Sequence, residues 1–324
     1  MGYKEITADY VLDCTKKENR SKAIDLINKA DAVITDAEDL SLTQGRYLRG
    51  GLLFRYSERL FKSGLRYLKA PMHFIKAYRT KKMSLLCGSA FAARDYALLG
   101  MYRHHRYKWG YFPQIKEYNL DTLLSNKHNN RLLWVGRLID WKHPEACIKL
   151  AKQLSERGLD FHIDIVGTGD MEERMRQLIV DQKIDELVSV LGAKQIFEVR
   201  QLMEDSDIFL FTSDRGEGWG AVLNEAMNSA CAVVAGSAIG SVPYLIEDGK
   251  NGLVFKDQDW NDLANKVTWL LEHPEERHSM GEAAYHTIVD TWNGEKAAEN
   301  FIQLVEDIKC GREPSILEGP GSRA

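Results

Sequence analysis

The strongest constraint on the fold is a regular alternation in the second half of the chain. Short apolar runs, each the length of a buried strand, are separated by stretches with the apolar spacing of helices. The predicted strands are residues 131–135, 161–166, 187–191, 208–211 and 232–235. The predicted helices are residues 143–157, 171–183, 221–230, 259–271 and 275–289. Such alternation is typical of a parallel sheet with helices on both faces, so we expect an α/β fold.

The first half of the chain predicts a second α/β domain with less regular elements. Its predicted strands are residues 32–35, 52–54, 84–87 and 108–112, and its predicted helices begin at Ser21 and Ala90. Residues 311–324 are rich in Gly, Pro and Ser, which predicts a flexible tail. The expected organisation is an N-terminal domain over 1–118, a polar linker over 119–130, a C-terminal domain over 131–291, a helix over 292–310 and the tail.

The composition is that of a globular chain. Of its 324 residues, 44% are hydrophobic and 28% are charged, which excludes a mostly disordered protein and allows two cores. The five cysteines are scattered, with no pair at metal-ligand spacing, so we expect reduced thiols. No apolar run approaches the about 20 residues of a spanning helix, and the polar first residues do not resemble a signal peptide. We therefore expect a cytoplasmic protein.

The charge is divided unevenly along the chain. Residues 1–125 carry a net charge of +9 and the remainder −13. From Arg46 to Lys108 there are 15 basic residues and only two acids, interleaved with apolar side chains. A basic amphipathic surface binds anionic lipid, so we expect peripheral membrane contact there; an ordinary exposed helix over a core is the alternative. No motif for nucleic-acid binding accompanies the charge.

A first cationic loop follows the predicted strand 131–135. It reads Gly136-Arg137-Leu-Ile-Asp-Trp-Lys142, and ligands of doubly wound sheets bind beyond the carboxyl ends of the strands. Gly136 allows a sharp turn, and Arg137 and Lys142 bracket the loop, so that both cations can meet one anion. Two solvated surface cations are the alternative interpretation.

Two glycine-bearing loops follow other strands at the same edge. Gly167 and Gly169 come directly after the strand 161–166, where paired glycines before a helix allow close approach of a ligand or its phosphates. A plain tight turn is the alternative, and the third glycine of the dinucleotide fingerprint is missing, which argues against an NAD enzyme. Residues 236–243 form a loop after the strand 232–235.

A third segment combines carboxylates with the start of a helix. It reads Glu217-Gly-Trp-Gly-Ala-Val-Leu-Asn-Glu225 and follows the strand 208–211. Free N–H groups at a helix start bind anions, and carboxylates accept hydrogen bonds from vicinal hydroxyls. Glu217 is expected in the loop before the helix and Glu225 on its second turn. The pattern suits a ligand that carries both a sugar and phosphates. The residues of this segment predicted to bind such a ligand, which the resemblance described next implies is a sugar donor, are Gly218, Trp219, Gly220, Ala221 and Glu225.

Together these segments resemble the signature of family 4 retaining glycosyltransferases of GT-B architecture, which have two Rossmann-like domains. That family has a Gly-Arg-x4-Lys loop for the donor diphosphate and a Glu-x7-Glu motif for sugar and ribose, matched here by Arg137 with Lys142 and by Glu217 with Glu225. The resemblance covers residues 131–289. More weakly, residues 55–59 and 108–113 resemble bacterial surface-polysaccharide members, and residues 292–308 resemble the helix that crosses back to the first domain.

The resemblance implies a glycosyltransferase that retains anomeric configuration, needs no metal or other cofactor, and uses a UDP- or GDP-sugar donor. Arg137, Lys142 and Glu217 would be its catalytic residues, and the acceptor would be a glycan or a lipid diphosphate in polysaccharide biosynthesis. The chain departs from the family at its start, where the first strand-loop-helix unit is not recognisable, so the N-terminal domain is expected to be incomplete. The alternatives are a truncated, non-catalytic nucleotide-sugar-binding protein and a GT-B-like epimerase.

Overall fold

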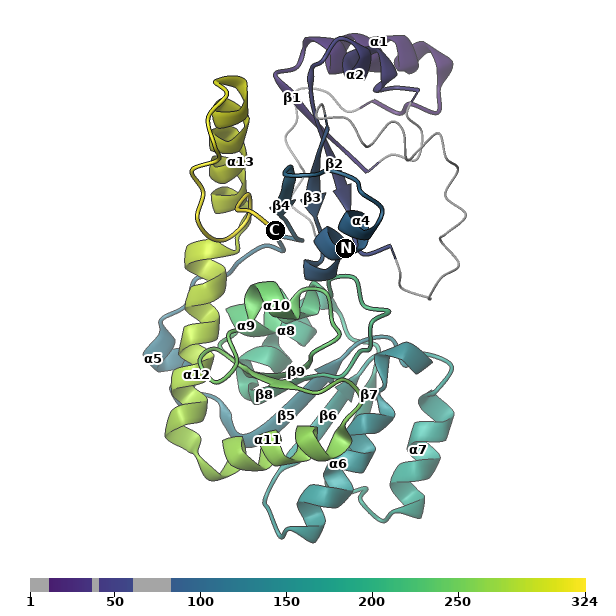
Figure 1. Cartoon of the computed structure of the whole chain (residues 1–324). Helices are drawn as coiled ribbons and strands as arrows, with labels where there is room; N and C mark the ends of the chain where they lie inside the picture. The colour runs from purple at the N-terminus through teal and green to yellow at the C-terminus, as the bar shows by residue number, and fades with distance from the viewer. Residues whose placement is uncertain (1–11, 37–40, 61–82) are drawn as a thin grey trace. The chain divides into compact units, whose positions relative to one another are not determined.

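The computed structural model describes residues 12–36, 41–60 and 83–324 (Figure 1). The chain divides into two compact units. The first unit consists of residues Met1–Gly110 and Ala297–Ala324, and the second of residues Tyr111–Lys296. The predicted site residues all lie in the second unit.

The second unit is built on a six-stranded parallel sheet of order β10-β9-β8-β5-β6-β7. Its strands are β5 (His128–Val135), β6 (His162–Val166), β7 (Val188–Gly192), β8 (Ser206–Phe211), β9 (Ala232–Gly236) and β10 (Leu253–Phe255). All five predicted strands are confirmed. The runs of β8 and β9 are buried along their whole length, whereas the edge strand β7 is largely half-buried. The short edge strand β10 was not predicted.

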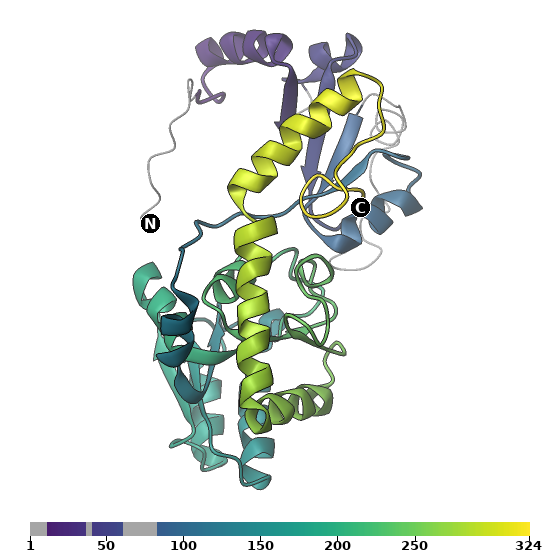
Figure 2. The same cartoon turned by 90° about the vertical axis from the view of Figure 1, so that its left-hand side faces the viewer.

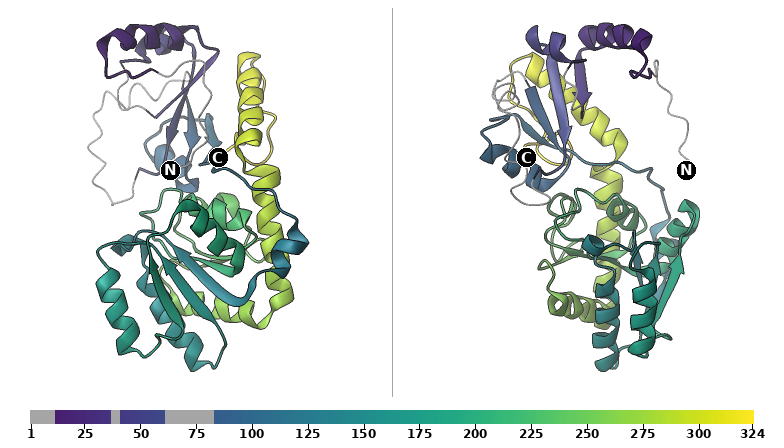
Figure 3. Two further views of the ribbon diagram at one scale, coloured as in Figure 1. Left: turned by 180° about the vertical axis from the view of Figure 1, so that it is seen from behind. Right: turned by 90° about the vertical axis from the view of Figure 1, so that its right-hand side faces the viewer.

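Helices cover both faces of this sheet (Figure 3). They are α6 (Glu145–Glu156), α7 (Glu172–Asp181), α8 (Ile196–Asp205), α9 (Val222–Asn228), α10 (Val242–Leu245), α11 (Trp260–Glu272) and α12 (Pro274–His286). Alternate strand residues point to opposite faces. Leu132 accordingly packs in the core under α6 and α11, whereas Leu133 packs in the core that contains Met227 of α9.

The polar stretch 119–130 is not the linker that was predicted. It contains helix α5 (Leu120–Ser125) and the start of β5. Asn119 begins the helix by accepting a hydrogen bond from the Thr122 N–H at 2.9 Å. Leu123 is buried against Tyr285 of the second unit, so the stretch has its own packing.

The first unit contains a four-stranded parallel sheet of order β1-β2-β3-β4. The elements are α1 (Lys17–Lys29), β1 (Ala32–Thr35), α2 (Gln44–Leu48), β2 (Leu52–Ser57), β3 (Met83–Cys87), α4 (Ala90–Leu98) and β4 (Arg106–Lys108). Helices α1 and α2 contact each other (Figure 2). The strand predicted at 108–112 is wrong: pairing with β3 begins at Arg106 and ends at Lys108, after which the chain leaves the sheet.

The tail is also not flexible as predicted. Residues 321–324 run beside β4: the Lys108 N–H donates to the Ser322 carbonyl at 2.8 Å and the Gly321 N–H donates to the Lys108 carbonyl at 2.8 Å. Before them, helix α13 (Gly294–Lys309) packs its buried Leu304 in the core with Phe54 of β2. Composition alone misled here, because the backbone of a Gly- and Ser-rich segment can still complete a sheet edge.

The basic stretch from Arg46 to Lys108 is only partly described, since residues 61–82 lie outside the described residues. Its first member is not a surface cation. The Arg46 guanidinium is buried and donates to the carbonyls of Ile27, Ala30, Asp31 and Leu52 at 2.6–2.8 Å. Arg46 thus satisfies carbonyls at the end of α1. In the part of the chain that the structure describes, no helix is long and apolar enough to span a bilayer.

Candidate functional site

The candidate donor site lies in loops at the carboxyl edge of the second sheet, where ligands of such sheets bind. Two of these loops follow the neighbouring strands β5 and β8. The β5 loop is fixed to the end of β6, since the Gly136 N–H donates to the Val166 carbonyl at 3.0 Å and the Leu138 N–H donates to the Thr168 carbonyl at 2.9 Å. The edge is therefore built from backbone contacts between loops.

Gly167 and Gly169 serve this packing of loops. A Cβ atom on Gly167 would lie 1.8 Å from the carbonyl oxygen of Gly136, and one on Gly169 would lie 2.3 Å from that of Leu138. Both glycines therefore let the neighbouring loop pack closely, and the close approach of a ligand to them stays a prediction. These glycines therefore shape the site through the position of the loop that carries Arg137.

Lys142 and Glu217 come together although 75 residues separate them. Lys142 ends the short 3₁₀ turn Asp140–Lys142, and its Nζ forms an ion pair with Oε2 of Glu217. Both side chains are largely buried, at 13% and 10% exposure. Ser213 Oγ donates to the same Glu217 oxygen at 3.3 Å. Two residues predicted separately as catalytic thus share one contact.

The loops that carry this pair are tied to each other through their backbones. Thr212 Oγ1 lies 2.8 Å from the carbonyl oxygen of Lys142 and 3.1 Å from that of His143. The indole N–H of Trp134 reaches the same hydroxyl at 2.8 Å, and the Asp214 N–H donates to the Trp141 carbonyl at 3.0 Å. These contacts contribute to holding the two loops together from within the protein.

Arg137 differs from Lys142 in its surroundings. Its side chain is exposed, and it makes no hydrogen bond or ion pair within the described ranges. A guanidinium that no protein acceptor engages is available to an anion, for which it offers a fork of donors.

The segment before α9 presents backbone N–H groups. None of the hydrogen bonds found among the described residues uses the N–H of residues 218–221, whereas the Leu223 N–H already donates to the Gly220 carbonyl at 2.9 Å. Gly220 has φ of 80°, a left-handed conformation that favours glycine. Successive free N–H groups in such a turn form a concave anion site.

The side chain of Trp219 lies in the core, so the predicted donor contact of this residue would have to come from its backbone. Its side chain is 1% exposed, its Nε1–H donates to Asn224 Oδ1 at 2.8 Å, and its ring packs edge-on or tilted against aromatic neighbours such as Trp292. Burying this large apolar ring in the core stabilises the fold more than placing it at a polar site would. Only its backbone can face a donor. The next loop supports it, because Ser241 Oγ donates to the Trp219 carbonyl at 2.5 Å.

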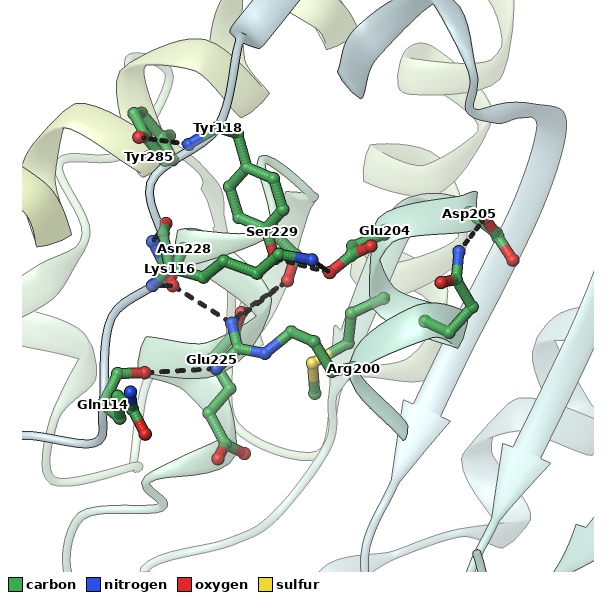
Figure 4. A network of polar contacts seen from close by, with 12 residues as sticks. Gln114, Lys116, Tyr118, Arg200, Glu204, Asp205, Glu225, Asn228, Ser229 and Tyr285 are labelled. Carbon is green, nitrogen blue, oxygen red and sulfur yellow. Dashed lines mark hydrogen bonds and ion pairs between the residues drawn. The ribbon is translucent and has the colours of Figure 1, made fainter. Parts of the chain in front are cut away.

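Glu225 lies in the first turn of α9, not the second, because the helix begins at Val222. Its carboxyl group is half-buried, and burial raises its pKa while the Arg200 guanidinium opposes that shift. A carboxylate near a helix start is stabilised by the helix dipole. Figure 4 shows this carboxylate pointing away from the contacts that its own carbonyl makes.

Those contacts form a polar network at the carboxyl end of α9 (Figure 4). Arg200 of α8 donates to the Glu225 carbonyl at 3.2 Å, to Asn228 Oδ1 at 3.1 Å and to Ser229 Oγ at 3.3 Å. The Asn228 side chain in turn exchanges two hydrogen bonds with the Lys116 backbone, at 2.8 and 3.0 Å. The helix that carries Glu225 is thus held at its far end.

One ionisable group beside the site, His143, was not predicted from the sequence. His143 directly follows Lys142, and its Nδ1 lies 3.1 Å from Glu145 Oε1 while its Nε2 lies 3.7 Å from Asp214 Oδ2. The hydrogen bond to Glu145 raises the pKa of this imidazole. Its place next to Lys142 in the sequence was the signal available. Within the described residues, no group of three or more His, Cys, Asp or Glu side chains is placed to hold a metal ion.

Sequence comparisons find related glycosyltransferases. The putative colanic acid biosynthesis glycosyltransferase WcaL of Salmonella typhimurium is 32% identical over 177 residues, which are 53% of this chain and 41% of that protein. The uncharacterized glycosyltransferase MJ1069 of Methanocaldococcus jannaschii is 28% identical over 199 residues, or 60% of this chain and 50% of that protein. The chain thus spans half or less of the length of these relatives.

Solved structures share the fold. The structure of HepE from Anabaena in complex with UDP has a TM-score of 0.68 at 17% identity and covers 88% of this chain and 82% of that one. A glycosyltransferase from Rickettsia africae has a TM-score of 0.65 at 16% identity, over 93% of this chain and 84% of that one. The predicted fold, with two Rossmann-like domains, is confirmed. The family model of glycosyl transferases group 1 matches residues 116–287, which is more than half of the chain, and the chain therefore belongs to that family.

Proposed function

We propose that this chain transfers a sugar from a nucleoside-diphosphate sugar to a glycan or a lipid-linked acceptor. The observation that carries the proposal is the contact between Lys142 and Glu217, which two separate loops bring together at the carboxyl edge of the sheet. A cation for phosphate next to a carboxylate for hydroxyls matches a ligand that contains both groups.

Each part of the donor has a candidate partner. Arg137 and Lys142 would bind the diphosphate together with the free N–H groups of residues 218–221. Glu217 would accept hydrogen bonds from hydroxyls of the sugar, and Glu225 would accept them from the ribose. UDP is the first nucleotide to test, because HepE, which shares the fold, was solved with it.

The chemistry we propose is transfer with retention by same-face attack and without a metal. Charge develops on the departing diphosphate, and fixed cations and N–H groups stabilise it; one well-placed donor contributes roughly 3–4 kcal/mol. The resemblance to retaining family 4 enzymes supports this assignment, and Arg137 and Lys142 supply the positive charge that it needs.

Polysaccharide biosynthesis is the proposed setting. The name of the WcaL relative supports it, since that protein is described as a putative colanic acid biosynthesis glycosyltransferase. Acceptors for such glycans are commonly lipid diphosphates, which fits the proposed binding of the basic stretch to anionic membrane. Flotation on anionic vesicles at low salt tests that part, and no binding would remove it.

A thermal-shift screen against UDP, GDP and their sugar conjugates tests the donor site. A nucleotide at about 100 times its dissociation constant should add roughly 2.7 kcal/mol of stability. We expect a shift with one nucleotide that is lost in Arg137→Ala and kept in Lys152→Ala, an exposed cation on α6. No shift with any nucleotide would contradict the proposal, and a shift without turnover would leave a binding protein.

A further inference from the structure

His143 has a left-handed backbone conformation that residues other than glycine adopt only in a few per cent of cases. It lies directly after Lys142 with φ of 50° and ψ of 51°, in the left-handed region. A side chain other than glycine or asparagine costs of order 1 kcal/mol there, and such residues persist where their surroundings hold them in place. The question is what holds this residue and to what end.

The imidazole lies between the two loops of the donor site and the start of α6. Its Nδ1 lies 3.1 Å from Glu145 of α6, and its Nε2 lies 3.7 Å from Asp214 Oδ2, which is too far for a hydrogen bond but close enough for an ion pair when the ring is protonated. Asp214 belongs to the loop that leads from β8 to Glu217, and its carbonyl accepts the Glu217 N–H at 3.1 Å. One ring thus connects the residue after Lys142 with the loop of Glu217.

We propose that the protonated His143 is a positioning residue that holds the Lys142 loop against the Glu217 loop and so makes donor binding depend on pH. The inference rests on the proposed function insofar as Lys142 and Glu217 bind the donor. Neutral imidazole can keep only one of its two contacts as a donor, because one ring nitrogen then lacks a proton. The imidazolium donates from Nδ1 to Glu145, and its positive charge attracts the Asp214 carboxylate, whose Oδ2 lies 3.7 Å from Nε2.

Several charged groups surround this ring. Glu145 comes from α6, Asp214 from the loop after β8 and Asp140 from the 3₁₀ turn, and all three raise the pKa of His143, Glu145 most strongly through its hydrogen bond. Asp257, which follows β10, also faces it, and burial raises the pKa of that carboxyl group. The ring also packs on Trp260 of α11, with 5.5 Å between ring centres.

The sign of the pH dependence follows from these neighbours. A folded-state pKa above the unfolded value means that the imidazolium contacts are fully present below the unfolded pKa of His143. They are lost as the pH rises through the raised folded-state pKa. Donor binding should therefore weaken as the pH rises from about 6.5 through the raised folded-state pKa of His143, above the second ionisation of a phosphate near 6.

Two variants separate positioning from a purely structural role. His143→Gly removes the ring and suits the left-handed backbone, so it should fold at least as well as the natural chain at pH 8.5, where urea unfolding checks it. His143→Asn also tolerates this backbone but cannot carry a charge. If the ring only filled space, neither variant would change how Lys142 and Glu217 interact.

The deciding measurement is a double-mutant cycle on urea unfolding at pH 6.5. Lys142→Met and Glu217→Gln should be coupled by about tenfold in the unfolding equilibrium constant of the natural chain. In the His143→Gly and His143→Asn backgrounds we expect the coupling to fall to about twofold. A coupling that is unchanged in both backgrounds overturns the inference.

Titration with UDP from pH 6.5 to 9 adds a functional readout. The natural chain should lose about tenfold in affinity for UDP over this pH range. His143→Gly should bind UDP weakly, and its affinity should change with pH only as far as the ionisation of UDP itself requires. Equal pH profiles for both proteins overturn the inference even if UDP binds well. If UDP and GDP both fail to bind, the proposed function fails, and the double-mutant cycle, which needs no ligand, decides the positioning role alone.

Discussion

The two ends of helix α9 gather cations in different ways. At the carboxyl end, Lys127 is buried and donates to the carbonyls of Met203, Glu204, Ser206 and Ser229 at 2.7–3.3 Å. At the amino end, Lys142 has one carboxylate partner, and Arg137 has no acceptor among the described residues.

The difference separates a structural cation from one that is ready for a ligand. Backbone carbonyls are fixed by the strands and helices to which they belong, so the partners of Lys127 cannot be exchanged without unfolding. A carboxylate on a loop can release its lysine to a phosphate, which offers the same charge and stronger acceptors. We therefore expect substitutions at the carboxyl end to change stability and those at the amino end to change turnover.

The largest effect should follow Lys127→Met. Its methyl group cannot donate, so several buried carbonyls lose their partner at a cost of about 1–3 kcal/mol for an unsatisfied group. We expect a total loss of about 4 kcal/mol in the free energy of unfolding, measured by urea denaturation. Nucleotide affinity at low temperature, where the variant is folded, should stay within about twofold; a large loss of affinity with full stability would reverse our assignment.

Arg137→Ala and Lys142→Ala should each reduce turnover by about two orders of magnitude in a donor-saturated assay, because each removes charge that stabilises the leaving diphosphate. The two differ in a second respect. Lys142→Ala leaves the largely buried Glu217 without its cation and should also lower stability, whereas Arg137→Ala should not. Lys152→Ala is the matched control, and near-normal turnover of both site variants would contradict the catalytic role.

Arg200→Lys should have an intermediate effect on both quantities. The guanidinium reaches three acceptors on α9 and residue 229, and also the Gln114 carbonyl at 3.4 Å, which a single ammonium cannot reproduce. We expect a loss of about 1–2 kcal/mol in stability. Combining Arg200→Lys with Glu225→Gln tests whether Arg200 affects nucleotide affinity through Glu225. If it does, the loss of affinity in the double variant should be smaller than the sum of the losses in the two single variants.

The sequence predicted the second unit well because the central strands of its sheet are buried on both faces. Runs such as Leu132–Trp134 have no polar interruption, and the position of each loop follows from where a run ends. The pairing of Lys142 with Glu217 could be expected from neighbouring strand ends. The first unit was predicted less well: β4 has three residues, and its second neighbour is the Gly- and Ser-rich tail, which has no apolar pattern.

Two kinds of residue lay beyond sequence reasoning. Trp219 and Arg46 have side chains typical of ligand or surface contacts, and only the fold shows that both are buried and fully engaged within the protein. His143 and Asp214 matter through a contact between segments 71 residues apart, which no local pattern encodes. Spacing identifies what the chain offers at a strand end, whereas tertiary contacts decide which of those groups remain available.

The smallest effects provide the sharpest test of the comparison between the two ends of α9, because each end has a serine that can be replaced by alanine. Ser213 Oγ donates to Glu217 at 3.3 Å, and Ser229 Oγ donates to the Glu225 carbonyl at 3.0 Å. We expect Ser213→Ala to raise the KM for the donor about twofold with stability unchanged, and Ser229→Ala to lower stability by about 0.5–1 kcal/mol with KM unchanged. If each serine affected both quantities equally, the two ends of α9 would act as one unit, and the division between structural and ligand-ready cations would not hold.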